Sequence, residues 1–383
     1  MAYRILAVFG TRPEAIKMAP LIKRLQQEEA FAIQVCVTGQ HRQLLNPVLS
    51  LFDIQPDFDL NIMKSGQDLA NITSRILLGV SEVLSQSQPD LVLVHGDTTT
   101  TFAASLACYY QRVPIAHIEA GLRTGNRFSP YPEEANRHLT SVLANYHFAP
   151  TDKAKANLLA EHHAEDRIWV TGNTVIDALM MMSQKIIQNR PLAQQMQQQF
   201  PFLDLHKKLI LVTGHRRENF GDGFKRICHA LRILAEQHTD IQIVYPVHLN
   251  PNVIEPTQRL LANIDNLFLL EPQPYLPFIY LMQKAYLILT DSGGIQEEAP
   301  ALQKPVLLMR EITERPEAVL AGTVKLVGTN TEYIVQSVKA LLNDPQQYQQ
   351  MSHAQNPYGD GKASERIVAV INNLHKEQCN GCI

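Results

Sequence analysis

Several features that would indicate a membrane or a nucleic-acid partner are missing from this sequence. No apolar stretch among its 383 residues is long enough to span a membrane, and the N-terminus has no signal-peptide pattern. The formal net charge is −3 and no basic run occurs, so the chain lacks the electrostatic footprint of a nucleic-acid-binding protein. We therefore expect a soluble cytoplasmic protein that neither inserts into a membrane nor binds nucleic acid.

Cysteine is also scarce, with five residues in the whole chain. Cys36, Cys108 and Cys228 lie among apolar neighbours, which predicts small core residues. Cys379 and Cys382 form a single C-x-x-C pair, which cannot complete a zinc site alone. No His and carboxylate set has metal-ligand spacing, and the G-x-G-x-x-G fingerprint is absent after the first strand. We expect neither a metal nor another cofactor.

What the chain does contain is an alternation of short apolar runs with amphipathic stretches. The predicted strands are 4–9, 33–37, 91–95, 114–118, 146–149, 208–213, 241–245, 286–290 and 305–309. The predicted helices include 13–28, 69–86, 98–110 and 221–238. Near-continuous apolar strands that alternate with helices are typical of parallel sheets. The sequence therefore predicts an α/β fold with two doubly wound, Rossmann-like parallel sheets.

The length indicates two domains, because one ordinary hydrophobic core does not grow to this size. A polar stretch at 172–206 contains the expected boundary. We predict an N-terminal domain over 1–172, a C-terminal domain over 173–360, and a last helix and tail over 361–383 that packs on the N-terminal domain. Loops of the ligand-binding type follow strands in both halves, which predicts an active site in the interdomain cleft, facing the strand C-termini.

The most informative segment is Asp291–Glu298, with sequence DSGGIQEE, which follows an apolar run at 286–289. It is typical of a strand, a tight turn and a helix start. Gly293 and Gly294 allow a close approach of the backbone to a ligand, and the new helix directs free N–H groups at an anion. Glu298, one turn further on, is suited to ribose hydroxyls. The pattern predicts a nucleotide diphosphate pocket, although a simple glycine turn is the alternative.

Two cations follow the first strand. Pro13 is suited to a first helical turn, with Thr11 or Arg12 near the cap. Arg12 and Lys17 then lie at or near a helix N-terminus, where a positive charge is normally unfavourable. This placement is explained if an anion binds between them. The alternative is a solvated surface pair.

Acidic residues follow two neighbouring strands of the first half. Asp97 comes directly after the buried run ending at His95, and Glu119 follows the next predicted strand. Glu133 and Glu134 come shortly after, with Arg137 one turn beyond as an expected substrate-binding residue. Helix capping can explain Glu134, but it does not explain three acids at one sheet edge. Crowded carboxylates have pKa values that differ, which suits an acid and a base acting on one substrate.

Further polar residues of the second half have the placement of ligand contacts. His215 ends the first strand of that half beside two arginines, so it is suited to phosphate or to proton transfer, with a structural role as the alternative. Gln273 lies in a loop that enters a helix, and Phe278 can pack on a base. Arg315 is suited either to phosphate or to holding Glu317.

Five motifs, taken in order, resemble those of the bacterial non-hydrolysing UDP-N-acetylglucosamine 2-epimerases. They are FGTRPEAIK at 9–17, HGDTT at 95–99, HIEAGLR at 117–123, GHRRE at 214–218 and DSGGIQEE at 291–298. The resemblance extends to about Ser364. It implies a two-domain fold of the glycosyltransferase-B type, reversible conversion of UDP-GlcNAc to UDP-ManNAc for cell-envelope polysaccharide, and a homodimer without metal or nicotinamide.

The resemblance also implies a mechanism and a set of site residues. UDP is eliminated to give 2-acetamidoglucal, and protonation from the other face with re-addition of UDP gives the epimer. The implied acid/base residues are Asp97, Glu119 and Glu133, and which serves which face stays open. The implied binding residues are His215, Arg12 and Lys17 for the substrate and leaving UDP, Ser292, Gly293 and Gly294 for phosphate, Glu298 for ribose, Gln273 and Phe278 for uracil, and Arg315.

A loop of the kind that some family members use for allosteric activation by UDP-GlcNAc is present at 40–43, with Gln40 and Gln43 as its possible ligands. Regulated members tend to carry an arginine where this chain has Ser65 and Gly66. The resemblance therefore leaves activation open.

Three other functions share parts of this pattern. A UDP-sugar glycosyltransferase needs only one base and an acceptor, which leaves two carboxylates without use. A hydrolysing epimerase releases free ManNAc, and its bifunctional relatives often add a sugar-kinase domain for which this chain has no room. A nucleotide-sugar sensor needs no group of carboxylates around the sugar.

Overall fold

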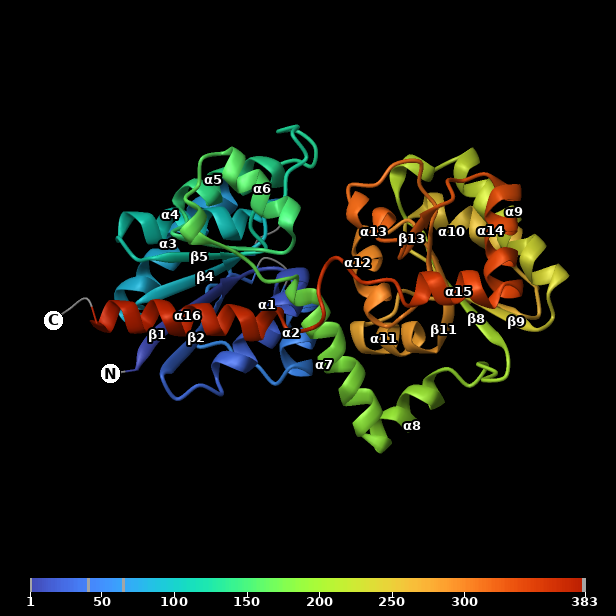
Figure 1. The fold of residues 1–383 in the computed structure, drawn as a ribbon, viewed down its shortest axis with the longest axis horizontal. Helices are drawn as coiled ribbons and strands as arrows, with labels where there is room; N and C mark the ends of the chain where they lie inside the picture. The colour runs from blue at the N-terminus through green and yellow to red at the C-terminus, as the bar shows by residue number, and fades with distance from the viewer. Residues whose placement is uncertain (1, 40–41, 64–65, 381–383) are drawn as a thin grey trace. The chain divides into compact units, whose positions relative to one another are not determined.

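The chain forms two compact α/β units. The computed structural model describes residues 2–39, 42–63 and 66–380, without the side chains of 42–44 and 378–380 (Figure 1). Unit 1 consists of Met1–Ala178 and Tyr358–Ile383, and unit 2 of Leu179–Pro357. Residues 173–178 and 358–360 therefore belong to the same unit as the N-terminal segment. No helix of the described part is both long and apolar enough to cross a bilayer.

Unit 1 is built on a seven-stranded parallel sheet of order β3-β2-β1-β4-β5-β6-β7. All five residues of the central strand β4 are buried, as expected for a strand covered on both faces. The strands are β1 (Tyr3–Phe9), β2 (Phe31–Val37), β3 (Phe58–Asp59), β4 (Leu91–His95), β5 (Ile115–Ile118), β6 (Tyr146–Ala149) and β7 (Ile168–Val170).

Helices cover both faces of this sheet (Figure 1). They are α1 (Arg12–Leu25), α2 (Arg42–Leu51), α3 (Leu69–Ser87), α4 (Thr99–Tyr110), α5 (Glu133–Leu143), α6 (Asp152–Ala160), the start of α7 (Thr174–Gln188) and α16 (Ala363–Asn380), with the short 3-10 helix η1 (Glu165–Arg167). Helix α16 packs on α1, and the His375 ring lies 4.6 Å from the Tyr3 ring. The carboxylate of Asp177 accepts the N–H groups of Ala363 and Ser364, the first residues of α16, at 3.1 and 2.7 Å.

Unit 2 has a six-stranded parallel sheet of order β10-β9-β8-β11-β12-β13. Its strands are β8 (Lys208–Thr213), β9 (Ile241–Pro246), β10 (Leu267–Leu270), β11 (Ala285–Thr290), β12 (Val306–Leu308) and β13 (Val324–Leu326). Its helices are the rest of α7, α8 (Arg190–Gln199), η2 (Arg217–Asn219), α9 (Asp222–Gln237), α10 (Pro251–Leu261), α11 (Tyr275–Lys284), α12 (Gly293–Ala301), α13 (Pro316–Leu320), α14 (Thr331–Asn343) and α15 (Pro345–Ser352).

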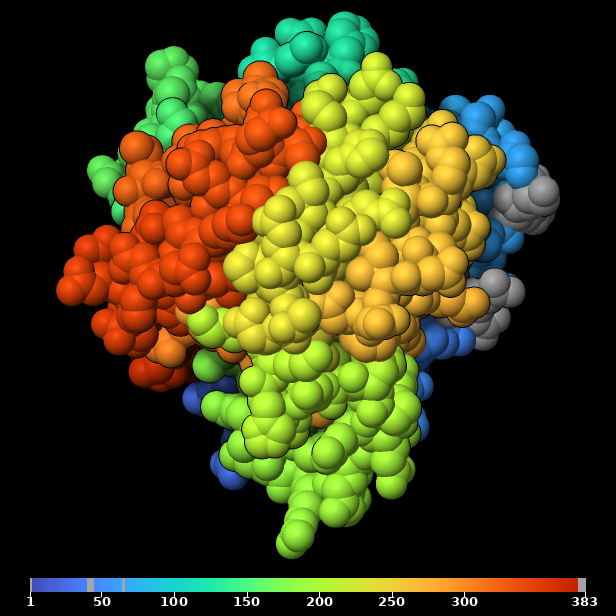
Figure 2. All heavy atoms as spheres, turned by 90° about the vertical axis from the view of Figure 1, so that its right-hand side faces the viewer, coloured from blue at the N-terminus to red at the C-terminus, as the bar shows by residue number. Residues whose placement is uncertain are grey.

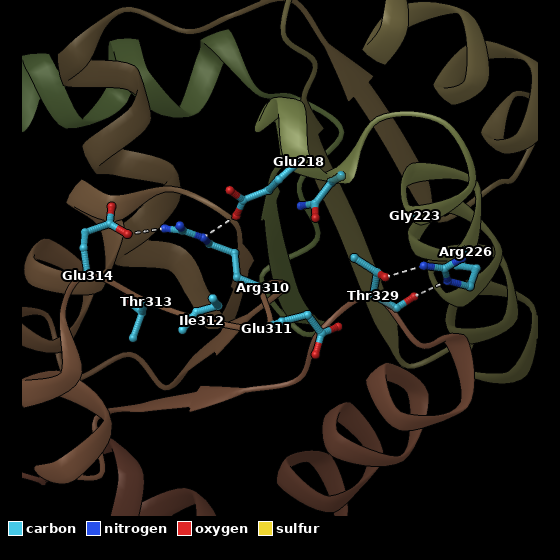
Figure 3. Close-up of a pocket in the computed structure, with 10 residues that line it drawn as sticks. Glu218, Gly223, Arg226, Arg310, Glu311, Ile312, Thr313, Glu314 and Thr329 are labelled. Carbon is cyan, nitrogen blue, oxygen red and sulfur yellow. Dashed lines mark hydrogen bonds and ion pairs between the residues drawn. The ribbon is translucent and has the colours of Figure 1, made fainter. Parts of the chain in front are cut away.

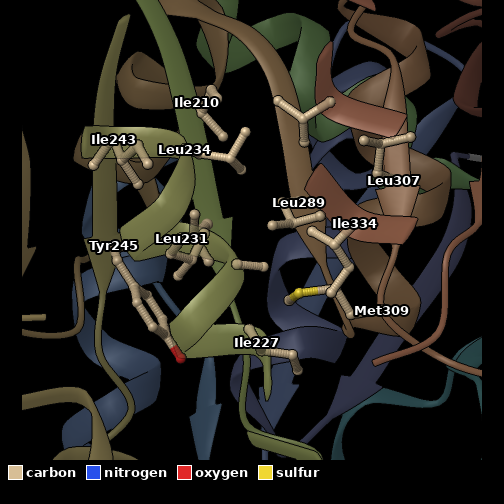
Figure 4. Packing of buried hydrophobic residues seen from close by; sticks show 14 of the residues in the cluster. Ile210, Ile227, Leu231, Leu234, Ile243, Tyr245, Leu289, Leu307, Met309 and Ile334 are labelled. Carbon is tan, nitrogen blue, oxygen red and sulfur yellow. The ribbon is translucent and has the colours of Figure 1, made fainter. Parts of the chain in front are cut away.

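The core of unit 2 lies between its sheet and the pair α9 and α14. Ile227 and Leu231 of α9 pack with Leu289 and Leu307 of the sheet and with Ile334 of α14 (Figure 4). Figure 2 shows a face of this unit on which the yellow segment of α9 lies beside the orange-red segment of α14, and these helices pack on each other.

The predicted fold class is confirmed, because both sheets are parallel and flanked by helices. All nine predicted strands and all four predicted helices are present, with shifts of a few residues at their ends. Four further strands, β3, β7, β10 and β13, are absent from the prediction. Cys36, Cys108 and Cys228 are buried free thiols, as expected. The Cys379 side chain and Cys382 lie outside the described residues.

Candidate functional site

The end of β1 in unit 1 is organised by a buried acid. Thr11 is the N-cap of α1, and the Glu14 carboxylate accepts the N–H groups of Gly10 and Thr11 at 3.0 and 2.7 Å. Thr98 and Thr101 donate their hydroxyls to the other oxygen of Glu14. Burial raises the pKa of Glu14, against these hydrogen bonds. Glu14 therefore ties the end of β1 to the start of α4. Our sequence analysis missed it, although the T-x-x-E capping-box pattern marks it.

Asp97 follows β4 and is held by an arginine. Arg137 of α5 donates Nε and Nη2 to Oδ2 of Asp97 at 2.9 and 2.7 Å, and Nη1 to Oε2 of Glu134 at 2.8 Å. Arg137, predicted as a substrate ligand, thus bridges two carboxylates in this structure. Glu134 lies in the first turn of α5, as a helix-start residue would, but it forms no capping hydrogen bond and accepts the N–H groups of Thr124 and Gly125.

Glu119 follows β5 in an unfavourable backbone conformation. Its φ of 63° lies in the left-handed region, which costs free energy for a residue with a Cβ. Lys17 of α1 forms an ion pair with its carboxylate. The His95 Nε2 lies 3.8 Å from the same oxygen. Lys17 therefore lies beside an acid, whereas Arg12 is the partly exposed first residue of α1.

The same region of unit 1 contains two buried imidazoles, those of His95 and His117. Burial lowers the pKa of His95 to about 3 and that of His117 to about 4, so both rings are neutral near pH 7. The Nε2 of His117 lies 2.7 Å from the carbonyl oxygen of Gly96, to which a neutral ring can donate. His117 thereby fixes the turn between β4 and Asp97.

Glu133 is the first residue of α5. Its Oε2 is buried and has no hydrogen-bond partner among the described residues. A buried carboxyl oxygen without a partner is costly, so it indicates a ligand. Unit 1 therefore presents three acids in three settings: Asp97 on an arginine, Glu119 on a lysine, and Glu133 with one oxygen unpaired.

In unit 2, the fully buried Asp291 organises the ends of β8 and β11. Its carboxylate accepts the N–H groups of His215 and Arg216 and the side-chain amide of Asn219. The His215 Nδ1 lies 3.5 Å from Asp291, and its ring stacks on His248 with centroids 5.5 Å apart. Burial lowers the pKa of His215, and the Asp291 charge opposes this. The His215 side chain is 41% exposed, so it remains accessible to a ligand.

The predicted phosphate turn is the N-terminus of α12. Ser292 is its N-cap residue, and its side chain forms no capping hydrogen bond. A Cβ at Gly293 would lie 2.5 Å from Nη1 of Arg315, so the end of that side chain would have to move. Arg315 forms ion pairs with Glu297 and Glu314 at 2.5 and 2.9 Å. The structure thus brings Arg315 to the turn, as a phosphate site requires.

A pocket of about 640 Å³ lies at the same edge of the second sheet (Figure 3). Arg310 on its wall pairs with Glu218 and Glu314, each at 2.6 Å, and Arg226 donates to Thr329. Its lining residues are Glu218, Asn219, Gly223, Arg226, Arg310, Glu311, Ile312, Thr313, Glu314 and Thr329. Glu314 therefore links this wall to Arg315. No sequence pattern predicted Arg310 or Glu314 as residues of a site.

The remaining predicted ligands of unit 2 lie on separate elements. Gln273 is in the loop after β10 and donates to the Glu271 carbonyl at 2.8 Å. Phe278 lies in the first half of α11 and Glu298 in α12, each partly buried.

The allosteric prediction cannot be placed on the structure, since Gln40 and the Gln43 side chain lie outside the described residues. Within the described ranges, no group of three or more His, Cys, Asp or Glu side chains has a metal-binding arrangement.

Comparison with known proteins gives one consistent family. A model of the family described as UDP-N-acetylglucosamine 2-epimerase matches residues 23–372. The chain is 60% identical over 370 residues to the UDP-N-acetylglucosamine 2-epimerase of Yersinia pestis, covering 97% of this chain and 98% of that protein. The enzyme of Escherichia coli K12 has the same identity and coverage.

Solved structures agree with these relatives. The UDP-GlcNAc 2-epimerase of Neisseria meningitidis bound to UDP-GlcNAc has a TM-score of 0.87 and 55% identity, covering 97% of this chain and all of that chain. The Methanocaldococcus jannaschii enzyme in complex with UDP-GlcNAc and UDP has a TM-score of 0.77 and 33% identity, covering 97% and 99%. A glycosyltransferase of Rickettsia africae, 16% identical with a TM-score of 0.64 and coverage of 98% and 99%, shares the fold.

Proposed function

The chain belongs to the UDP-N-acetylglucosamine 2-epimerase family, and we propose that it interconverts UDP-GlcNAc and UDP-ManNAc without releasing free sugar. The geometry of unit 1 supports this proposal. A C2 epimerisation needs proton transfer on both faces of the sugar, and Asp97, Glu119 and Glu133 provide carboxylates in different electrostatic settings. This variety of settings is the observation that carries the proposal.

The proposed chemistry is elimination followed by re-addition. The hydrogen at C2 is not acidic, so its simple removal is unfavourable. A carboxylate takes the C2 proton while the C1–O bond breaks, its electron pair leaves on UDP, and a C1=C2 double bond forms in 2-acetamidoglucal. A protonated carboxyl group then delivers a proton to the opposite face of C2 as the UDP oxygen re-forms the bond to C1. No oxidant or reductant is consumed.

Unit 1 supplies the acid/base residues of this proposal. Glu119 is our choice for the C2 proton, with Asp97 or Glu133 opposite. Lys17 orients Glu119 and balances its negative charge, which its ion pair supports. Arg12 completes the positive side of the site, where charge on the departing diphosphate needs stabilisation.

Unit 2 supplies the nucleotide contacts of this proposal. His215 and the turn Ser292–Gly294 bind the diphosphate with Arg315, because free N–H groups and a guanidinium favour an anion. Glu298 binds the ribose, and Gln273 with Phe278 binds the uracil. The related enzyme of Neisseria meningitidis binds UDP-GlcNAc and that of Methanocaldococcus jannaschii binds UDP-GlcNAc and UDP, which supports the assignment.

The biological setting belongs to the same proposal. A cytoplasmic homodimer that supplies ManNAc units for cell-envelope polysaccharide is what the family resemblance implies. This setting rests on the resemblance alone.

The test is proton NMR of UDP-GlcNAc with the purified protein in D₂O, without an acceptor. UDP-ManNAc with deuterium at C2 is the expected product, since the returning proton comes from a group that exchanges with solvent. Free ManNAc plus UDP would instead assign a hydrolysing reaction. An unchanged spectrum would contradict epimerisation.

A further inference from the structure

Glu134 is a fully buried acid that shares its carboxylate between two tasks. Its Oε1 accepts the N–H groups of Thr124 and Gly125 at 2.9 and 3.0 Å. Its Oε2 accepts Nη1 of Arg137 at 2.8 Å. One side chain thus holds the segment that leads from β5 towards Glu133 and also holds a guanidinium.

Arg137 passes this constraint on to Asp97. Its Nε and Nη2 both reach Oδ2 of Asp97, and the amide of the neighbouring Asn136 donates to the Asp97 carbonyl at 2.9 Å. Within the described part of the chain, no hydrogen bond reaches Oδ1. The aspartate is therefore fixed through one oxygen, which leaves the other available to a ligand.

Burial of a charged carboxylate is unfavourable without compensation, so the arrangement around Glu134 has a specific reason. Burial opposes ionisation of Glu134, but Arg137 and the two backbone N–H groups outweigh it, and the pKa is lowered. Glu134 is thus an ionised, fully buried acid. It follows Glu133 directly in the chain and is linked to Asp97 through the guanidinium of Arg137. Packing alone would not require a charge at this position.

We propose that Glu134 is a positioning residue for the epimerisation, which it serves by holding Arg137 so that Asp97 presents Oδ1 to the sugar. This inference rests on the proposed function. Glu134 touches no substrate itself. It acts because a bidentate guanidinium fixes a carboxylate only while its own orientation is fixed.

The decisive variant is Glu134→Gln. Its amide oxygen can still accept from Thr124 and Gly125, whereas its NH₂ group faces Nη1 of Arg137, donor against donor. We expect kcat for epimerisation to fall between about 10-fold and 100-fold, since small misplacements of reacting groups have effects of this size. The Kd for UDP should stay near the wild-type value, because Glu134 is not among the proposed UDP contacts.

A double variant tests whether Glu134 acts through Arg137. Arg137→Ala should lower kcat at least as much as Glu134→Gln, and the combination should lower it no further than Arg137→Ala alone. Arg137→Lys should also be impaired, because one ammonium group cannot bridge two carboxylates. Asp177→Asn is the matched control. It alters another buried acid of unit 1 that accepts two N–H groups, so thermal stability should fall while kcat stays near wild type.

The outcomes separate cleanly. A folded Glu134→Gln variant with wild-type kcat overturns this inference and leaves the proposed function standing. Multiplicative losses in the double variant also overturn it, because Glu134 would then act independently of Arg137. A wild-type protein that does not epimerise UDP-GlcNAc in the same assay refutes the proposed function itself.

Discussion

At the scale of single residues, the two acids after β4 and β5 have the sharpest consequences. Asp97→Asn and Glu119→Gln keep the shape of each side chain and remove its ability to take a proton. We expect each to lower kcat by about 10²–10³. Binding of UDP, measured by calorimetry, should persist because most of the proposed UDP contacts lie in unit 2. Near-wild-type rates in both variants would show that the acid/base assignment is wrong.

Gly293 and Gly294 differ in the space around them. A methyl group at Gly293 would displace Arg315 from its ion pairs, whereas the nearest atom to a methyl group at Gly294 is 3.7 Å away. Gly293→Ala should therefore lower the free energy of unfolding by about 1 kcal/mol or more. Gly294→Ala should lower it less. Urea denaturation of the two ligand-free variants checks the difference, and equal midpoints would contradict it.

The sequence indicated the types of site residues better than their partners. Asp97 and Glu119 could be predicted because each follows a buried run, and parallel strands end at one edge of a sheet. Lys17 was expected beside an anionic ligand, but it pairs with Glu119 from 102 positions away. Arg137 was expected to bind substrate, and its bridge between Asp97 and Glu134 was not foreseen. Ion pairs between distant elements depend on tertiary packing, which local patterns do not contain.

At the scale of elements, the strands missing from the prediction share one position. β3 and β7 are the two edges of the first sheet, and β10 and β13 are the two edges of the second. Each has at most four residues, and in all four strands most residues are partly buried or exposed. An edge strand is hydrogen-bonded to one neighbouring strand only, and its side chains are more exposed to solvent. It therefore lacks the continuous apolar run that marks a central strand.

Adjacent strands β4, β5 and β6 each carry a buried histidine, which makes stability sensitive to acid. Burial lowers the pKa of His95, His117 and His147 to about 3, 4 and 3. The unfolded chain, with histidine pKa values of about 6.5, binds protons that the folded protein excludes. Stability is therefore lost as the pH falls below 6.5, by up to about 1.4 kcal/mol per histidine per pH unit.

Urea denaturation at pH 7.5 and 5.5 checks this expectation. His147→Phe retains a ring beside His163 but removes one titrating group, so its stability should depend less steeply on pH. Equal stability of the wild type at both pH values would contradict the argument.

At the scale of the whole molecule, the C-terminal helix belongs to the unit that begins the chain. Asp177 holds the first N–H groups of α16, and Asn173 donates to the carbonyl of Tyr358 at 2.8 Å. Asp177→Ala leaves two backbone donors without this acceptor and should lower the free energy of unfolding by about 1–3 kcal/mol. In the Asp177→Ala variant, amide hydrogen exchange in α16 should be faster than in the wild type, whereas exchange in α14 of unit 2 should change less. Unchanged protection of α16 would contradict the role of Asp177.

The overall plan of two doubly wound sheets could be predicted because βαβ alternation is a local pattern repeated along the chain. The point at which the chain changes unit is less visible, since α7 runs continuously from Thr174 to Gln188 across the division after Ala178. A helix that belongs to two units has one unbroken periodicity, so its sequence carries no mark of the change.

The discontinuous make-up of unit 1 has a consequence for protein synthesis. The ribosome completes unit 2, a single continuous segment, before it makes α16, although it begins unit 1 first. The face of α1 that packs on α16 therefore lacks its partner helix while the residues of unit 2, Leu179–Pro357, are translated. A surface that is buried in the finished unit and exposed during this interval makes the nascent chain prone to aggregation.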